Sequence, residues 1–284
     1  MVAGRGTALR KWWHGGMMAR FWESGPGGAG GAGTGGAAGA GTGAAAAAAP
    51  AAWLLNLGHR EYTAVWQLQK RLVSERQRDL IPDLLILVEH PHVITLGRGA
   101  RAAQNVLAPG DMPIFEIERG GDVTYHGPGQ LVGYPVLKLE GAERDLHRYL
   151  RGLEECLIRA LKSYGITGER RPGLTGVWAA GRKLASIGVA VRRWVTLHGF
   201  ALNVSTDLAR FQAIHPCGLE ASLMGSIKSL TGRAPPIPEV GREVALRFGE
   251  VFGRALAPAP SELWELDRAL ALDPSGPQRG KVDP

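Results

Sequence analysis

Apolar residues recur along the chain with two different periods, and these periods predict both helices and strands. Over residues 61–77 and 144–164 they recur every three to four positions, which is typical of a helix with one buried face. Residues 239–256 predict a final helix. Short apolar runs between turn residues predict strands over 53–57, 84–89, 93–96, 114–118, 123–125, 131–139, 177–180 and 183–191, and residues 194–204 supply another strand pair.

This order of elements predicts a single α/β or α+β domain over residues 53–260. Residues 25–52, just before it, contain only Gly, Ala, Thr and Pro. Such a tract has almost nothing to bury and a high entropic cost of ordering. We therefore expect residues 1–52 to be a low-complexity, disordered N-terminal extension and residues 261–284 to be a C-terminal tail.

Composition and charge narrow the classes of function. Of the formal net charge of 33 − 26 = +7, residues 1–52 contribute 4 − 1 = +3, so +4 is left for the rest of the chain. No dense Lys/Arg stripe with interleaved aromatic residues is present, which argues against nucleic-acid binding. No apolar run has the length of a membrane span, and no secretory signal is evident. We expect a cytoplasmic protein.

The two cysteines, Cys156 and Cys217, lie 61 residues apart. No CxxC pair and no Cys/His cluster with zinc spacing occurs, so we expect no metal site. Cys156 falls within the apolar stripe of the helix at 144–164, which is typical of an unreactive core residue. Cys217 instead lies between Pro216 and Gly218 in a predicted loop. An inert core position remains an alternative for Cys217, but if one cysteine reacts, we expect it to be this one.

Two further segments combine glycines with polar side chains. Residues 119–130 read RGGDVTYHGPGQ, and so many glycines are tolerated where the backbone approaches a ligand closely or takes positive φ. The alternative is a hairpin with turn glycines and a solvent-facing Arg119. Residues 181–188 read GRKLASIG, in which strand alternation places Lys183 on one face with Ala185 and Ile187. A lysine there either extends to solvent or is held in a pocket as a catalytic charge.

Taken together, these segments resemble the lipoyl(octanoyl) transferases. The resemblance rests on residues 119–130 (RGGDVTYHGPGQ), 181–188 (GRKLASIG), 198–204 (HGFALNV) and 215–218 (HPCG), and residues 89–98 (EHPHVITLGR) are similar to another family segment. Four motifs in the same order make the resemblance specific, and it covers about residues 53–260. It does not include the first 52 residues.

The resemblance implies a biotin/lipoate protein ligase-like catalytic fold, with a mixed sheet and flanking helices, and no cofactor or ATP requirement. It implies that Cys217 is the nucleophile that forms an acyl-thioester and that Lys183 lowers its pKa. The implied substrate-binding residues are Arg119, Gly120, Gly121, Asp122, Val123, Thr124, Tyr125, His126, Ser186, Ile187, Gly188, Gly199, Phe200 and Ala201.

The implied donor is octanoyl-acyl carrier protein, and the implied acceptors are lipoyl domains of 2-oxoacid dehydrogenases and the glycine cleavage H protein. The chemistry makes physical sense because an ammonium beside a thiol stabilises the reactive thiolate. Three alternatives stay open at this point: an ATP-dependent lipoate or biotin ligase, which needs no nucleophilic cysteine; a non-catalytic carrier-binding module; and a cysteine hydrolase, which would use water as acceptor.

Overall fold

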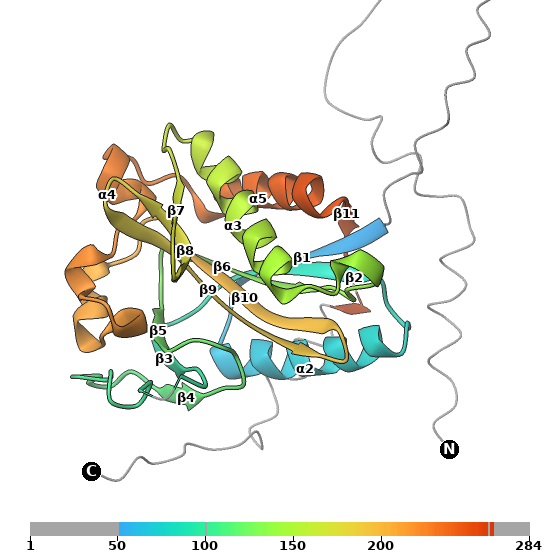
Figure 1. The fold of residues 1–284 in the computed structure, drawn as a ribbon, viewed down its shortest axis with the longest axis horizontal. Helices are drawn as coiled ribbons and strands as arrows, with labels where there is room; N and C mark the ends of the chain where they lie inside the picture. Colours follow the sequence, from blue (N-terminus) through green and yellow to red (C-terminus); the bar gives the residue numbers. More distant parts are fainter. Residues whose placement is uncertain (1–50, 100, 261, 264–284) are drawn as a thin grey trace, which may run out of the picture. The chain divides into compact units, whose positions relative to one another are not determined.

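The computed structural model describes residues 51–99, 101–260 and 262–263. Most of the predicted N-terminal extension and C-terminal tail, residues 1–50 and 264–284, lies outside the described residues. Within them, the chain alternates between strands and helices (Figure 1). The elements that build the main sheet are β1 (Ala51–His59), β2 (Asp83–Glu89), β6 (Gln130–Val136), β7 (Glu169–Arg171), β8 (Leu174–Ala179), β9 (Arg182–Arg192), β10 (Val195–Asn203) and β11 (Ala255–Pro258).

The main sheet has eight strands in the order β11-β1-β2-β6-β10-β9-β8-β7. The pairs β1–β11 and β1–β2 are parallel, whereas the pairs from β2 to β7 are antiparallel. A mixed sheet was expected and is confirmed. Two of the predicted site segments, residues 181–188 and 198–204, lie side by side near its centre, because β9 pairs with β10.

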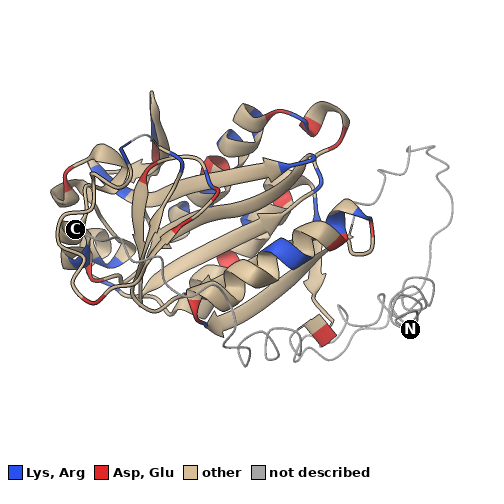
Figure 2. Cartoon of the chain, turned by 90° about the horizontal axis from the view of Figure 1, so that it is seen from below, with Lys and Arg blue, Asp and Glu red and all other residues tan. Residues whose placement is uncertain are grey.

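Three longer helices cover the two faces of this sheet (Figure 1). They are α2 (Tyr62–Gln77), α3 (Leu146–Lys162) and α5 (Ile237–Phe252). Alternation along β2 sets the division: Leu85 and Leu87 pack in the cluster that includes α3 and α5, whereas Leu84 and Ile86 pack in the cluster that includes α2. Charged residues lie mainly on the helices and connecting segments, and the strands of the sheet are largely uncharged (Figure 2).

A second, three-stranded sheet has the order β4-β3-β5. Its strands are β3 (Val93–Leu96), β4 (Ile114–Glu116) and β5 (Val123–His126). Ile94 and Tyr125 from this sheet share a buried cluster with Phe211 and Met224. These last two residues flank the short 3₁₀ helix η4 (Pro216–Gly218), so the small sheet supports the segment that contains Cys217.

The structure corrects several predicted elements and adds one strand. The helix expected over 239–256 ends at Phe252, because Gly253 takes a left-handed conformation with φ 60°, and the chain then forms β11. Residues 194–204 form one strand, β10, which pairs with β9 and β6. β7, with the polar sequence Glu-Arg-Arg, was not predicted. In addition, β1 begins at Ala51, two residues before its predicted start.

Candidate functional site

Cys217 lies in a strained turn at the edge of a buried cavity. It has φ 56° and ψ 34° inside η4, a left-handed conformation that is uncommon for a residue with a side chain. The turn is closed by hydrogen bonds from the amides of Gly218 and Leu219 to the carbonyls of His215 and Pro216, of 3.0 and 3.1 Å. The side chain is half-buried. The backbone around Cys217 thus fixes the direction of its sulfur while leaving it reachable.

Lys183 lies near the start of β9 and is 1% exposed. Its Nζ donates to Sγ of Cys217 at 3.6 Å. The carbonyl of Lys183 accepts from the amide of Gly225 at 3.0 Å, which ties β9 to the segment after Cys217. Of the two predictions for this lysine, extension to solvent is wrong: the ammonium is buried and faces the sulfur.

Most of the predicted binding segments line the cavity beside Cys217. It is lined by Tyr62, Ile117, Arg119, Gly121, Thr124, His126, Val132, Tyr134, Ser186, Ile187, Gly188, His198, Gly199, Phe200, Ala201 and Cys217. Glycines bring backbone close to it: a Cβ at Gly188 would lie 2.9 Å from Cδ of Arg119. Apolar walls with polar groups at few points are typical of a site for a small apolar ligand.

Arg119 brings a second positive charge into the cavity. Its Nη2 donates to the carbonyl and the hydroxyl of Thr95 at 2.8 and 3.1 Å, and its Nη1 donates to the carbonyl of Gly120 at 3.1 Å. Burial lowers the pKa of this guanidinium, and the neighbouring Cys217 and Tyr62 oppose that effect. Its Nε is buried without a hydrogen-bond partner among the described residues. The predicted solvent-facing alternative for Arg119 is wrong, since the side chain is buried.

Two buried histidines are held neutral next to the cavity. His90 contacts the carbonyl of Arg60 through Nδ1 at 2.7 Å and the hydroxyl of Tyr134 through Nε2 at 2.9 Å, so Nδ1 donates and Nε2 accepts. Burial lowers the pKa of His90 to about 4. His126, whose Nδ1 lies 2.8 Å from Oε1 of Gln130, has its pKa lowered to about 3 by burial and by His90. At neutral pH both rings are uncharged, and His126 is a polar but uncharged part of the cavity wall.

A third histidine, His198, lines the cavity and contacts Glu118. It has φ 60° within β10, and its Nε2 lies 3.5 Å from Oε2 of Glu118. Burial lowers the pKa of His198, and Glu118 opposes that effect. Burial would raise the pKa of Glu118, but the contact with His198 and the charge of Lys70 outweigh it and lower that pKa to about 2. Glu118 is therefore ionised throughout the physiological range.

Four of the predicted binding residues do not line the cavity. Along β5, Thr124 and His126 face it, whereas Val123 and Tyr125 alternate into the opposite core. The carboxylate of Asp122 accepts from the amide of Val123 and from Asn105, and the amide of Gly120 donates to Val189. These residues shape the loop, and their part in substrate binding stays a prediction.

Five lining residues were not among the predicted site residues: Tyr62, Ile117, Val132, Tyr134 and His198. Tyr62, Val132 and Tyr134 belong to apolar patterns that predict core, and no feature of those patterns separates a cavity wall from solid packing. His198 stands in the segment HGFALNV that supports the family resemblance, so that motif contained a usable indication.

The other cysteine is unsuited to catalysis. Cys156 is fully buried on α3, its Sγ donates to the carbonyl of Val244 at 3.5 Å, and burial raises the pKa of its thiol.

Across residues 51–99, 101–260 and 262–263, no group of three or more His, Cys, Asp or Glu side chains could hold a metal ion. In that same part of the chain, no helix combines the length and apolar character that crossing a bilayer requires.

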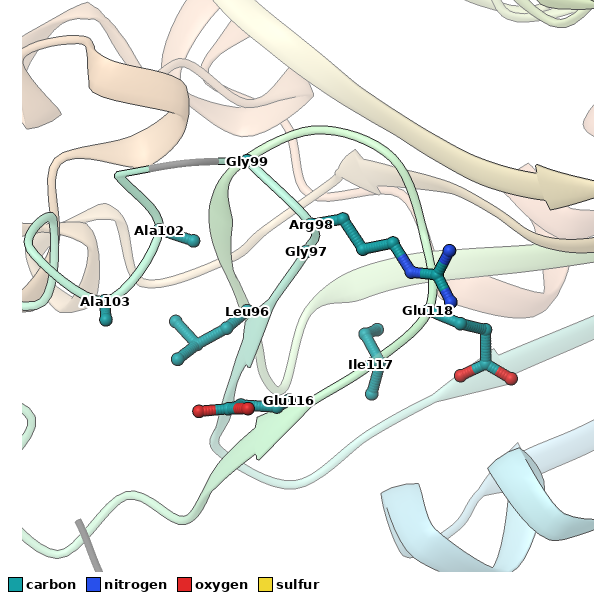
Figure 3. A pocket seen from close by; sticks show the side chains of 9 residues that line it. All are labelled: Leu96, Gly97, Arg98, Gly99, Ala102, Ala103, Glu116, Ile117 and Glu118. Carbon is teal, nitrogen blue, oxygen red and sulfur yellow. The ribbon is translucent and has the colours of Figure 1, made fainter.

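A separate, more open hollow is lined by residues 96–99, 102–103 and 116–118 (Figure 3). Figure 3 shows the side chain of Arg98 extending toward Glu118, while Glu116 points away from it. Ile117 also lines the cavity beside Cys217, but no predicted site residue lines this hollow. The sequence therefore gives no reason to place the site in this hollow.

Comparison with solved structures supports the fold. The crystal structure of lipoate-protein ligase A bound with ATP is similar with a TM-score of 0.60 at 18% identity, covering 78% of this chain and 94% of that one. A bipartite lipoate protein ligase from Thermoplasma acidophilum gives a TM-score of 0.59 at 19% identity, covering 78% and 92%. The predicted ligase-like catalytic fold is confirmed. At such identities the likeness concerns the fold alone.

Comparison with known sequences defines the family. Residues 61–249 match the model of the lipoyl protein ligase A/B catalytic domain. An octanoyltransferase of Geobacter metallireducens is 52% identical over 193 residues, which cover 68% of this chain and 90% of that protein. One from Synechococcus elongatus is 47% identical over 232 residues, which cover 80% and 99%. The chain therefore belongs to the octanoyltransferase family and is an acyltransferase.

Proposed function

We propose that the protein moves an octanoyl group from octanoyl-acyl carrier protein to a lysine of a lipoyl domain, through a thioester on Cys217. The observation that supports this most directly is the 3.6 Å contact between the buried ammonium of Lys183 and the sulfur of Cys217. It lies at the edge of an apolar cavity, and relatives nearly half identical in sequence are octanoyltransferases.

In the first half-reaction the thiolate of Cys217 attacks the carbonyl carbon of the carrier thioester. The positive charges of Lys183 and Arg119 favour the anionic sulfur before attack. When the tetrahedral intermediate collapses, the bond to the carrier sulfur breaks, and that sulfur takes a proton from Lys183. One thioester replaces another, so little bond energy is lost.

In the second half-reaction the neutral amine of the acceptor lysine attacks the thioester at Cys217. Its surplus proton passes to the now neutral Lys183, and the carbon–sulfur bond breaks to leave an amide and the thiolate of Cys217. The thiolate of Cys217 and the ammonium of Lys183 that began the cycle are thus regenerated. Lys183 serves as acid in the first step and as base in the second.

The cavity supplies binding energy for the acyl chain. Burial of each methylene contributes about 0.8 kcal/mol, so an octanoyl tail contributes several kcal/mol. The backbone amide of Gly218, next to Cys217, already donates to the carbonyl of His215, so it is a poor candidate to hold an oxyanion. Arg119, with its unpartnered Nε among the described residues, is the better candidate to stabilise the developing negative charge.

The family resemblance also supports the finer assignments. We propose that the acceptors are lipoyl domains of 2-oxoacid dehydrogenases and the glycine cleavage H protein, and that no ATP or other cofactor takes part. A cytoplasmic location fits the two free cysteines, since reducing compartments keep thiols unpaired.

The test is to mix the protein with octanoyl-acyl carrier protein and measure the intact mass of the enzyme. We expect the mass of one octanoyl group to be added to the wild type and to Cys156→Ala, but not to Cys217→Ala. Addition of a lipoyl domain should then move the group to that domain. The matched pair of cysteine variants separates a specific thioester from general acylation.

Each rival function predicts a different result. An ATP-dependent ligase would label the lipoyl domain from ATP and free octanoate, and would not need Cys217. A cysteine hydrolase would release free octanoate with or without the acceptor. Full activity of Cys217→Ala would contradict the proposal outright, since no other described cysteine is accessible.

A further inference from the structure

The side chain of Lys183 passes over a glycine in the neighbouring strand. β8 pairs with β9 in antiparallel fashion, with Trp178 opposite Lys183 and an irregular register between Val177 and Trp178. Gly176 lies next to this irregularity with φ 133°. A Cβ there would lie 2.9 Å from Cε of Lys183 and would also overlap the carbonyl oxygen of Ala185. Only glycine leaves room for the lysine stem.

A buried carboxylate on α3 holds this glycine. The amide of Gly176 donates to Oε1 of Glu154 at 3.1 Å. The other carboxylate oxygen, Oε2, forms ion pairs with Arg151 and with Arg170, the latter at 3.1 Å. The side chain of Glu154 is 0% exposed. The two oxygens thus have different partners: Oε1 accepts from the backbone of Gly176, and Oε2 forms the ion pairs with the arginines.

Stability alone does not explain a charged group at this position. Burying a carboxylate is costly, and the arginines recover only part of that cost because the side chains of Arg151 and Arg170 are 53% and 35% exposed, so water screens their charges. An apolar residue of similar volume would serve the core as well or better. The hydrogen bond to Gly176 accounts for the charge, since a carboxylate accepts more strongly from a backbone amide than a neutral group does.

We propose that Glu154 is a positioning residue that acts through Gly176 to keep the ammonium of Lys183 beside Cys217. This inference rests on the proposed function, in which Lys183 activates Cys217. Without the anchor, the backbone at Gly176 shifts, the slot for the lysine stem is lost, and the Nζ–Sγ distance increases. The catalytic groups remain present but are less well aligned.

Charged groups lie close to both Cys217 and Glu154. Cys217 faces Lys183 and Arg119, and His215 lies two residues before it. Glu154 faces Arg151 and Arg170, and its neighbour Glu155 pairs with Arg170 and Arg159. Glu155 therefore shares Arg170 with Glu154, but the amide of Gly176 donates to Glu154 and not to Glu155. Glu155 is thus a matched control that disturbs the same ion pairs and leaves the bond to Gly176 in place.

The experiment measures the rate at which iodoacetamide alkylates Cys217 between pH 6 and pH 9, by mass spectrometry of the full-length protein. The test variants are Glu154→Ala and Gly176→Ala. Their controls are Glu155→Ala and Gly173→Ala; Gly173 has φ 76° in the same hairpin, and a Cβ added there would meet no described atom within 4 Å. Lys183→Met marks the result of losing the ammonium altogether.

If the ammonium recedes by about 2 Å at an effective dielectric constant of about 20–40, alkylation near pH 7 slows about tenfold. We expect this in both test variants, with the pH midpoint moved upward, and rates within about twofold of the wild type in both controls. Circular dichroism identifies variants that fail to fold. If Glu154→Ala does not fold, Glu154→Gln replaces it, because glutamine has the same shape as glutamate. We then expect a smaller upward shift of the pH midpoint.

The outcomes separate the two proposals. An unchanged pH profile in the folded Glu154 variant, or a shift of equal size in Glu155→Ala, overturns the positioning role while leaving Lys183 as activator. An unchanged profile in Lys183→Met contradicts the proposed function itself, because the ammonium would then have no effect on the sulfur.

Discussion

Replacing Lys183 by methionine removes one positive charge and keeps an unbranched stem of similar length. The wild-type Nζ lies 3.6 Å from Sγ of Cys217. Two unit charges at this distance interact by about 1 kcal/mol at the dielectric constant of water and by about 5 kcal/mol at an effective value of about 20. Because Cys217 is half-buried, we take about 2 kcal/mol, which corresponds to about a 30-fold loss of thiolate while the thiol is mostly protonated.

The assay is the rate of alkylation of Cys217 as a function of pH, compared with the rate of octanoyl transfer from the carrier protein. Alkylation should fall about 30-fold near neutral pH and recover at high pH, where even an unassisted thiol ionises. Transfer should fall further and should not recover, because the proton donor and acceptor for both half-reactions is missing. Lys183→Arg keeps the charge and should retain much of the alkylation rate but little of the transfer.

The reasoning fails if Lys183→Met alkylates at the wild-type rate across the whole pH range. It also fails if transfer recovers fully at high pH, since Lys183 would then act only on the ionisation of the sulfur. Cys156 provides an internal control in every sample: it is 0% exposed, and it should remain unmodified until the protein unfolds.

Three further predictions concern the rest of the molecule. A Cβ at Gly188 would lie 2.9 Å from Cδ of Arg119, so Gly188→Ala should lose most transfer activity. Gly181 lies at an open turn, so Gly181→Ala should keep the activity and lose about 1 kcal/mol of unfolding free energy, measured in urea. Truncation of the fully buried Leu157 to alanine should cost about 2–5 kcal/mol in the same unfolding assay. Burial lowers the pKa of His90 to about 4, below its unfolded value, so the unfolded state binds one more proton at this residue between those values. His90 alone should therefore lower the stability by about 1.4 kcal/mol per pH unit as pH falls from about 6.5 towards 4. His90→Gln should flatten that dependence, and an equally steep curve in the variant would contradict the assignment.

The sequence pattern predicted the elements that have a clear hydrophobic period and missed those without one. α2 and α3 were expected to within about two residues, because their buried faces repeat at helical spacing. β7 consists of three polar residues, so it has no alternation to detect. The end of α5 was misplaced because apolar residues continue through Leu256, and the left-handed Gly253 that ends the helix was the usable indication.

The residues of the site were predictable in type but not in arrangement. Cys217 stood out because proline and glycine flank it, yet its distance to Lys183 depends on how η4 packs against β5 and how β9 pairs with β8. The cavity walls from Tyr62 and Tyr134 were hidden, since aromatic residues on a buried face are typical of core. What lines a cavity is decided by several elements together, and a single chain segment does not contain that information.

The burial of Lys183 shows why an irregular strand pair matters for the chemistry. Regular alternation places this lysine on one face with Ala185 and Ile187, and a lysine at the end of a regular hairpin extends to solvent. Here the register shifts between Val177 and Trp178, directly opposite Lys183, and the glycine beside the shift opens a path for the stem toward Cys217. Irregular pairing of this kind redirects a side chain while both strands continue. The strain at Cys217 and the irregularity at Gly176 therefore belong together, because each turns one of these two side chains toward the other.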